Sequence, residues 1–344
     1  MSYSSINIFV LFILTSSSIA DSMHAKEKQK LSLLCKEMFY HAYKSYMKNA
    51  FPADELKPLS CKGRYRDHLP SLNDVNDVFG NFSLTLIDSL DTLFIMGYIE
   101  EFDSATKRIV NEISFDSDVI VTTFETNIRV IGGLLSAHLL AKIFQASNLS
   151  LNQHYLLWYK DQLLDLALNV GYRLLPAFSS PTGLPYRRIN LKSGMKSEQV
   201  KSVKETCTAC AGSLILEFAA LSRLSGDSIF EEKASKAMNV LWNSRNHQTN
   251  LVGRAINVET GAWIKKEAGI GGGIDSYYEY LAKAYLLLDD PIYLYRWQIH
   301  YGAIMKYTGK VGTTRDMKFI LLITTLITLY ACTYIKINGM YKIL

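Results

Sequence analysis

The strongest constraint on the fold is that apolar residues recur at helical spacing along almost the whole body of the chain. Nine segments carry apolar side chains three and four residues apart, as a helix with one buried face does. These segments are residues 37–50, 82–98, 101–113, 125–146, 155–174, 209–224, 229–245, 275–288 and 292–307. We therefore predict an all-α toroid or solenoid built from helical hairpins.

Strand-like alternation is confined to two places. Residues 183–191 alternate in part, and residues 251–265 predict a β-hairpin that turns at Glu259-Thr260-Gly261. A doubly wound sheet needs regular strands between its helices, and the sequence has none of that pattern. We expect small β-hairpins between the helices and no large sheet.

Composition and charge narrow the functional classes. The chain has 344 residues, of which 49% are hydrophobic and 20% charged, so it can bury a sizeable core and is not of a disordered or fibrous class. Its 37 basic and 32 acidic residues give a net charge of +5 and are interspersed along the sequence. Without a basic cluster to follow a phosphate backbone, no nucleic-acid partner is expected.

The beginning of the chain predicts entry into the secretory pathway. Residues 1–20 have an apolar core followed by a small-x-small cleavage motif, although no Lys or Arg precedes Lys26. We interpret this segment as a signal peptide; a buried N-terminal helix is the alternative. Two N-glycosylation sequons, at Asn81 and Asn148, agree with a lumenal protein.

The other end carries an uncharged apolar segment, residues 319–335, between Lys318 and Lys336. A helix of this length spans about 26 Å, slightly less than the roughly 30 Å of bilayer hydrocarbon. The segment predicts membrane association through a tail anchor. Its Thr and β-branched residues also fit a strand, or sequence that is not part of the fold.

Five cysteines leave at least one without a partner in the chain. Cys207-Thr-Ala-Cys210 has the spacing of a redox motif, but no βαβ pattern surrounds it and an apolar helix follows. We favour two ordinary helix residues over a redox centre. The histidines show no zinc-ligand spacing.

Two acidic residues interrupt one of the most apolar helical segments. Asp88 and Asp91 are three residues apart and share one face of a helix that is otherwise apolar almost all round. Carboxylates in such surroundings need partners. They either form a structural pair held by Arg, or bind a hydroxyl-rich ligand in a polar lumen.

Two further acids stand at predicted helix starts. Glu125 and Arg129 are four residues apart, so their side chains can meet, while Asp275 follows a run of glycines. The structural alternatives are a capping box between Thr122 and Glu125, and an N-cap at Asp275. If the two acids converge in a ring of helices, they have the arrangement that glycoside hydrolysis requires.

The motifs around these acids resemble those of glycoside hydrolase family 47, the class I α-1,2-mannosidases. The matching stretches are IDSLDTL at 87–93, FETNIRVIGGLLSAH at 124–138 and IDSYYEYLAKAYLL at 274–287. Residues 38–64 and 208–234 resemble the endoplasmic reticulum (ER) degradation-enhancing branch of that family. The resemblance extends from about residue 37 to residue 307.

This resemblance implies an (α/α)7 barrel and the inverting removal of α-1,2-linked mannose from high-mannose N-glycans of misfolded glycoproteins in the ER lumen. Glu125 matches the general acid, and Asp275 matches a second active-site carboxylate with a base or water-orienting role. Arg129, Asp88 and Asp91 are the expected substrate-binding residues.

The resemblance also implies partners and a cofactor. Cys61 is expected to contact ER oxidoreductases, and calcium is the expected cofactor. The family's Arg-Pro-Glu motif, with another catalytic carboxylate, and its calcium-binding Thr-Glu-Ala-His stretch do not occur in this sequence. No calcium ligand can therefore be assigned in this chain.

We expect a signal peptide at 1–20, a partial family domain at 21–308 and an unrelated tail at 309–344, with about nine of the fourteen helices of a sevenfold ring. A ring that does not close leaves helix faces unburied, which predicts marginal stability and little or no hydrolysis for such a form. The alternative function is a non-catalytic factor that binds glycans or misfolded proteins.

Overall fold

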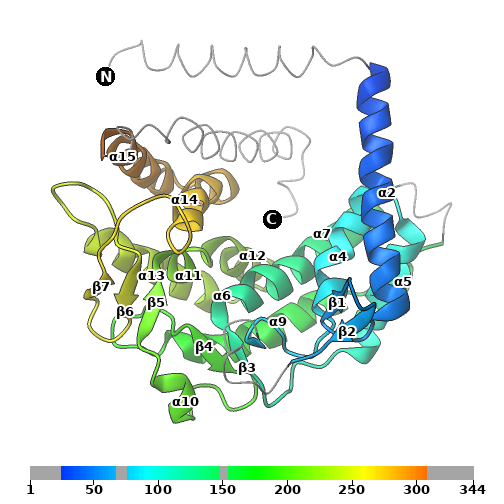
Figure 1. The fold of residues 1–344 in the computed structure, drawn as a ribbon, viewed down its shortest axis with the longest axis horizontal. Helices are drawn as coiled ribbons and strands as arrows, with labels where there is room; N and C mark the ends of the chain where they lie inside the picture. Colours follow the sequence, from blue (N-terminus) through cyan, green and yellow to red (C-terminus); the bar gives the residue numbers. More distant parts are fainter. Residues whose placement is uncertain (1–24, 67–75, 148–153, 308–344) are drawn as a thin grey trace.

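The computed structural model describes residues 25–66, 76–147 and 154–307. The predicted signal peptide at 1–20, the Asn148 sequon and the apolar segment 319–335 lie outside these residues. Helices dominate the described part, as expected from the periodicity (Figure 1). The helices are α2 (Ala25–Asn49), α4 (Leu84–Ile95), α5 (Ile99–Glu112), α6 (Thr123–Glu125), the π-helix η2 (Thr126–Ile131), α7 (Gly132–Ala146), α9 (Gln162–Leu174), the 3-10 helix η3 (Leu175–Phe178), α10 (Glu198–Lys201), α11 (Thr208–Gly212), α12 (Ile215–Ser225), α13 (Ile229–Ser244), α14 (Asp275–Leu288) and α15 (Pro291–Tyr307).

Four predicted helices differ from the observed ones. Helix α2 begins at Ala25, twelve residues before the predicted start at residue 37. The segment predicted from residue 155 becomes helical only at Gln162, because Asp161 has a left-handed backbone with φ 68°. The segment 209–224 is divided into α11 and α12 by Ser213 and Leu214. The segment 125–146 is one continuous helical run, but its first part is the π-helix η2.

Within the described residues, the strands are three residues long and form three small sheets. The predicted hairpin is present as β6 (Ala255–Asn257) and β7 (Trp263–Lys265), joined through the expected turn. Strand β4 (Arg188–Asn190) lies within residues 183–191, whose partial alternation predicted a strand. Sequence periodicity missed β1 (Glu55–Lys57), β2 (Lys62–Arg64), β3 (Ile120–Thr122) and β5 (Glu205–Cys207), since three residues carry too little alternation to detect. β1 pairs with β2, β3 with β4, and β5 with β6.

The Cys207-Thr-Ala-Cys210 motif is not simply part of a helix. Cys207 is the last residue of β5 and the N-cap of α11, and a disulfide joins it to Cys210. The expectation of two ordinary helix residues is therefore wrong.

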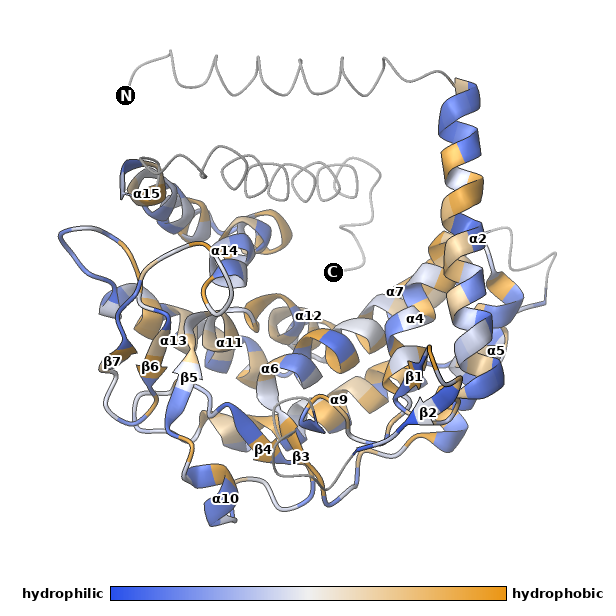
Figure 2. Cartoon of the chain, in the orientation of Figure 1, coloured by the Kyte–Doolittle hydropathy of each residue, from blue (hydrophilic) through white to orange (hydrophobic). Residues whose placement is uncertain are grey.

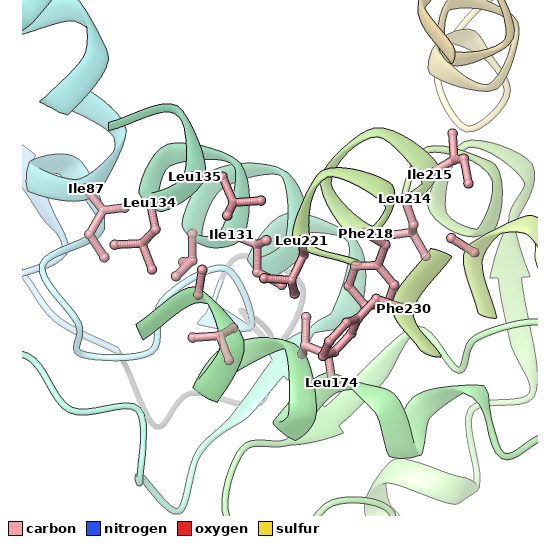
Figure 3. Close-up of a cluster of buried hydrophobic side chains, with 14 of the residues drawn as sticks. Ile87, Ile131, Leu134, Leu135, Leu174, Leu214, Ile215, Phe218, Leu221 and Phe230 are labelled. Carbon is pink, nitrogen blue, oxygen red and sulfur yellow. The ribbon is translucent and has the colours of Figure 1, made fainter. Parts of the chain in front are cut away.

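The core lies between successive helices of an arc that runs from α5 and α4 through α7, α9 and α12 to α13 (Figure 1). Figure 3 shows the buried side chains that these helices contribute. The labelled ones are Ile87, Ile131, Leu134, Leu135, Leu174, Leu214, Ile215, Phe218, Leu221 and Phe230. The run Thr123–Ala146 is apolar enough to cross a membrane, but half of its most apolar window is buried, as in the core helix of a soluble protein.

The two ends of the described arc differ from its middle. The first half of α2 projects from the rest of the fold and carries both polar and apolar residues (Figure 2). Leu33, in this half, is 60% exposed. At the other end, α14 and α15 pack against each other. The candidate site is found in the middle of the arc, where partly exposed polar side chains lie next to the buried core.

Candidate functional site

Glu125 stands on a turn that the backbone holds in place. Strand β3 ends at Thr122, whose Oγ1 accepts a hydrogen bond from the Glu125 N–H at 3.0 Å. The predicted cap is therefore present, but only half of the capping box forms. The Thr122 N–H donates to the Asp77 carbonyl at 2.8 Å, so the Glu125 carboxylate is not needed there and is available for other contacts.

Arg129 joins two of the predicted acids. Its Nε donates to Glu125 Oε2 at 2.7 Å, and its Nη1 donates to Asp88 Oδ2 at 3.0 Å. Burial lowers the pKa of Arg129, but the two carboxylate hydrogen bonds outweigh that effect and raise it overall. Burial raises the pKa of Asp88, while the Arg129 hydrogen bond opposes the rise. One guanidinium thus holds two carboxylates in fixed positions.

Helix α4 brings Asp88 and Asp91 to this site by close packing against α7. A Cβ on Gly133 would lie 3.1 Å from the Ile87 carbonyl oxygen, so the two helices approach closely at that point. The expected Arg partner is confirmed for Asp88 and is wrong for Asp91. Asp91 instead accepts a hydrogen bond from Ser136 Oγ at 3.1 Å, because Arg129 is already committed one turn away.

A cavity of about 270 Å³ borders this group. Asp88 and Arg129 form one side of it, and the β1–β2 hairpin contributes Glu55 and Arg64. Its remaining lining residues are Asp54, Val78, Phe79, Leu84 and Thr85. Carboxylates, guanidinium groups and an aromatic ring together suit a ligand with both hydroxyl groups and apolar C–H faces.

Glu217 is a site residue that sequence reasoning missed. Its carboxylate accepts hydrogen bonds from Asn127 Nδ2 at 2.8 Å and from Tyr280 Oη at 2.7 Å, so it joins η2, α12 and α14. Burial raises the pKa of Glu217, and both hydrogen bonds oppose the rise. A signal was available, because Glu217 interrupts the apolar run LILEFAAL just as Asp88 interrupts its own.

Asp275 occupies the start of α14 but does not cap it. The N-cap is Ile274, and Asp275 is the exposed first residue of the helix, so the N-cap expectation is wrong. The glycine run before it is fixed at Gly273, which has φ 91° and whose carbonyl accepts the Ala209 N–H at 2.9 Å. Helix α11 packs against both α6 and α14 and so links the turn of Glu125 to the segment of Asp275.

The described residues do not fit a calcium site by themselves. Calcium takes six to eight oxygen ligands, several of them carboxylates. Among the described residues, no group of three or more His, Cys, Asp or Glu side chains could hold a metal ion. Asp88 and Glu125 also share the positive charge of Arg129, which opposes a cation beside them. No chemical step is therefore assigned to a metal.

Comparisons with known proteins agree with the geometry. The sequence profile of glycosyl hydrolase family 47 matches residues 38–330. The human protein named ER degradation-enhancing alpha-mannosidase-like protein 3 is 53% identical over 300 residues, which are 87% of this chain and 32% of that protein. Alpha-mannosidase I MNS4 of Arabidopsis thaliana is 44% identical over 87% of this chain and 44% of its own length.

Among solved structures, the alpha-1,2-mannosidase from Trichoderma reesei, an (α/α)7 barrel, superposes with a TM-score of 0.67 and 27% identity. The superposition covers 80% of this chain and 54% of the fungal enzyme. The chain spans about a third of the human relative and just over half of the fungal barrel.

Proposed function

Because the chain belongs to glycosyl hydrolase family 47, we propose that it trims α-1,2-linked mannose from high-mannose N-glycans of misfolded glycoproteins in the ER. The observation that carries this proposal is the hydrogen-bonded group of Glu125, Arg129 and Asp88, of which Arg129 and Asp88 line the cavity. The relatives named for ER degradation and for α-1,2-mannosidase activity support the substrate class.

We assign Glu125 as the general acid. Its Oε2 is held by Arg129, which leaves Oε1 to carry the proton that is donated to the glycosidic oxygen as the bond to the anomeric carbon breaks. Because the turn is fixed by the Thr122 cap and the ion pair, the carboxyl group needs little reorganisation when the sugar binds.

We assign Asp275 to the water. In an inverting hydrolysis, a water oxygen attacks the anomeric carbon from the face opposite the leaving group, and a carboxylate accepts the proton that this water releases. Asp275 is exposed at the start of α14, and α11 connects its segment to the turn of Glu125. These contacts support a position of Asp275 at the same opening of the helical arc as Glu125.

The hydroxyl groups of the sugar are assigned to Arg129, Asp88 and Asp91. Arg129 and Asp88 line the cavity, which continues toward the β1–β2 hairpin, where Glu55 and Arg64 offer further polar groups. A cavity of about 270 Å³ is large enough for one monosaccharide unit. Its expected occupant is therefore a mannose residue of a branched glycan.

We further propose a location in the ER lumen. Asn81 is exposed and is a suitable acceptor for N-glycosylation, while Cys61 is an exposed free thiol that an ER oxidoreductase can reach. Calcium and membrane association remain predictions of the sequence.

A second candidate is glycan binding without hydrolysis. One observation favours it: the hydrogen-bonded group of Glu125, Arg129 and Asp88 does not include Asp275. That group can bind sugar hydroxyls whether or not a water is activated opposite it.

The test uses the purified protein with a radiolabelled high-mannose oligosaccharide, measuring both bound glycan and released mannose. Glu125→Gln should lower mannose release by about 100-fold or more and retain glycan binding. The matched control is Glu112→Gln, which alters an exposed carboxylate of α5 and should leave both quantities unchanged.

Binding without release by the wild-type protein would favour the second candidate. Release that is equal in the wild type and Glu125→Gln contradicts the assignment of the acid.

A further inference from the structure

The disulfide between Cys207 and Cys210 has no part in the proposed hydrolysis. It lies where β5 meets α11, and both cysteines are half-buried rather than enclosed in the core. The proposed acid, the cavity and the sugar-binding residues make no use of its sulfur atoms. Its role therefore has to be inferred from its own surroundings.

Hydrogen bonds also hold this segment in place. The Thr208 N–H donates to the Arg254 carbonyl at 3.1 Å, and Thr208 Oγ1 donates to the Gly253 carbonyl at 2.6 Å. The Ala209 N–H donates to the Gly273 carbonyl at 2.9 Å. The disulfide also joins residues with a sequence separation of only 3. Closing so short a loop removes little conformational entropy from the unfolded chain. Structural stabilisation is a weak explanation for it.

The surroundings of Cys207 favour a thiolate. The Cys210 N–H donates to Cys207 Sγ at 2.9 Å. The exposed Arg254 lies on the same side of Gly273 as Cys207: a Cβ built on Gly273 would be 3.3 Å from Arg254 Nε and 3.8 Å from Cys207 Cβ. A backbone donor and a nearby positive charge both stabilise a sulfur anion, and partial exposure gives access to a reaction partner.

We propose that Cys207 and Cys210 form a thiol–disulfide exchange site whose substrate is a protein dithiol. A thiolate of the incoming protein attacks Cys210 Sγ, forming a mixed disulfide and releasing Cys207 as the thiolate that Arg254 stabilises. The second thiol of the incoming protein then attacks the mixed disulfide and releases Cys210.

The exchange is balanced in atoms and electrons. The incoming protein loses two electrons and two protons and gains a disulfide, while Cys207 and Cys210 gain both electrons and both protons as thiols. The reverse reaction reoxidises the site with a protein disulfide. This activity is independent of the proposed hydrolysis, so either can fail without the other.

The test is a redox titration of the wild-type protein in glutathione buffers. Each sample is acid-quenched and alkylated, and the tryptic peptide 205–223, which contains no other cysteine, is quantified by mass spectrometry. We expect the doubly alkylated fraction to rise from one tenth to nine tenths over about an 80-fold change in the ratio of squared glutathione to glutathione disulfide, at millimolar glutathione.

A peptide that stays oxidised across the whole series identifies a structural disulfide and overturns the proposal. A peptide that stays reduced in glutathione disulfide also overturns it.

The kinetic variant is Arg254→Gln. Loss of the guanidinium should slow the reduction of the pair by glutathione at least about threefold, because the leaving thiolate is less stabilised. Arg108→Gln, on the exposed face of α5, is the matched control and should reduce at the wild-type rate. An Arg254→Gln rate equal to that of the control contradicts the assigned mechanism.

Discussion

At the scale of single residues, short-range spacing predicted part of the site. The separation of four between Glu125 and Arg129 and the need of Asp88 for a cation both follow from sequence, and all three meet in the structure. The sequence does not show that Glu125 and Asp88 both bind the Arg129 guanidinium, because this contact depends on how α4 packs on α7. Glu217 was missed for the same reason: both its partners lie on other segments.

Arg129→Lys tests the bridge between the two carboxylates. A lysine keeps the charge but cannot donate in two fixed directions to Glu125 and Asp88 at once. We expect mannose release to fall by about 10-fold or more with the fold retained, measured as released sugar and by circular dichroism. Arg108→Lys is the control on a surface pair. An Arg129→Lys protein with the control's activity would mean that the bridge does not matter.

His300 predicts how stability depends on pH. It is fully buried, its Nδ1 donates to the Asn250 carbonyl at 2.8 Å, and its Nε2 faces Tyr277 Oη at 3.3 Å. Burial lowers the pKa of His300 from 6.5 to about 4. The unfolded chain therefore binds the proton more readily, so stability is fully present above pH 6.5 and is lost as the pH falls toward 4.

The expected loss from His300 is about 3 kcal/mol of unfolding free energy at pH 4. It is measured by urea unfolding at several pH values. His300→Gln should show a shallower fall between pH 7 and 4 than the wild type, whereas His247→Gln, at an exposed position, should keep the wild-type slope. Equal slopes for all three proteins would contradict the prediction.

At the scale of elements, periodicity predicted helices because each buries one face, a property of local sequence. It did not predict the strands β1, β2, β3 and β5, which are too short to show alternation, nor the pairing of β3 with the distant β4. It also did not predict η2, since six residues in a π-helix are too short to change the apolar periodicity of the α-helix that follows.

Two glycines in helices test the packing of these elements. A Cβ on Gly171 of α9 would lie 2.6 Å from Leu221 and 2.8 Å from Phe230, whereas one on Gly302 of α15 meets nothing within 4 Å. Gly171→Ala should therefore destabilise the protein by about 1–3 kcal/mol, while Gly302→Ala should stabilise it by about 0.5–1 kcal/mol through helix propensity. Urea unfolding measures both; two changes of the same sign would contradict the described packing.

At the scale of the whole molecule, the helical class was predictable because nearly every segment carries the same periodicity. The arrangement of the helices was not, since amphipathic faces specify burial without specifying a partner. The barrel was predicted from the motif resemblance, and the superposition on a family 47 enzyme agrees with that prediction over 80% of the chain. The arc in Figure 1 places the candidate site at its middle, where α4, η2 and α12 meet.

In the proposed mechanism, Glu125 protonates the leaving oxygen in an inverting hydrolysis. Proton NMR of the first mannose released from an α-1,2-linked oligosaccharide tests this role. We predict that β-mannose appears first, before mutarotation, and that its signal is lost in Glu125→Gln. Mannose released first as the α-anomer, or β-mannose produced equally by Glu125→Gln, would contradict it.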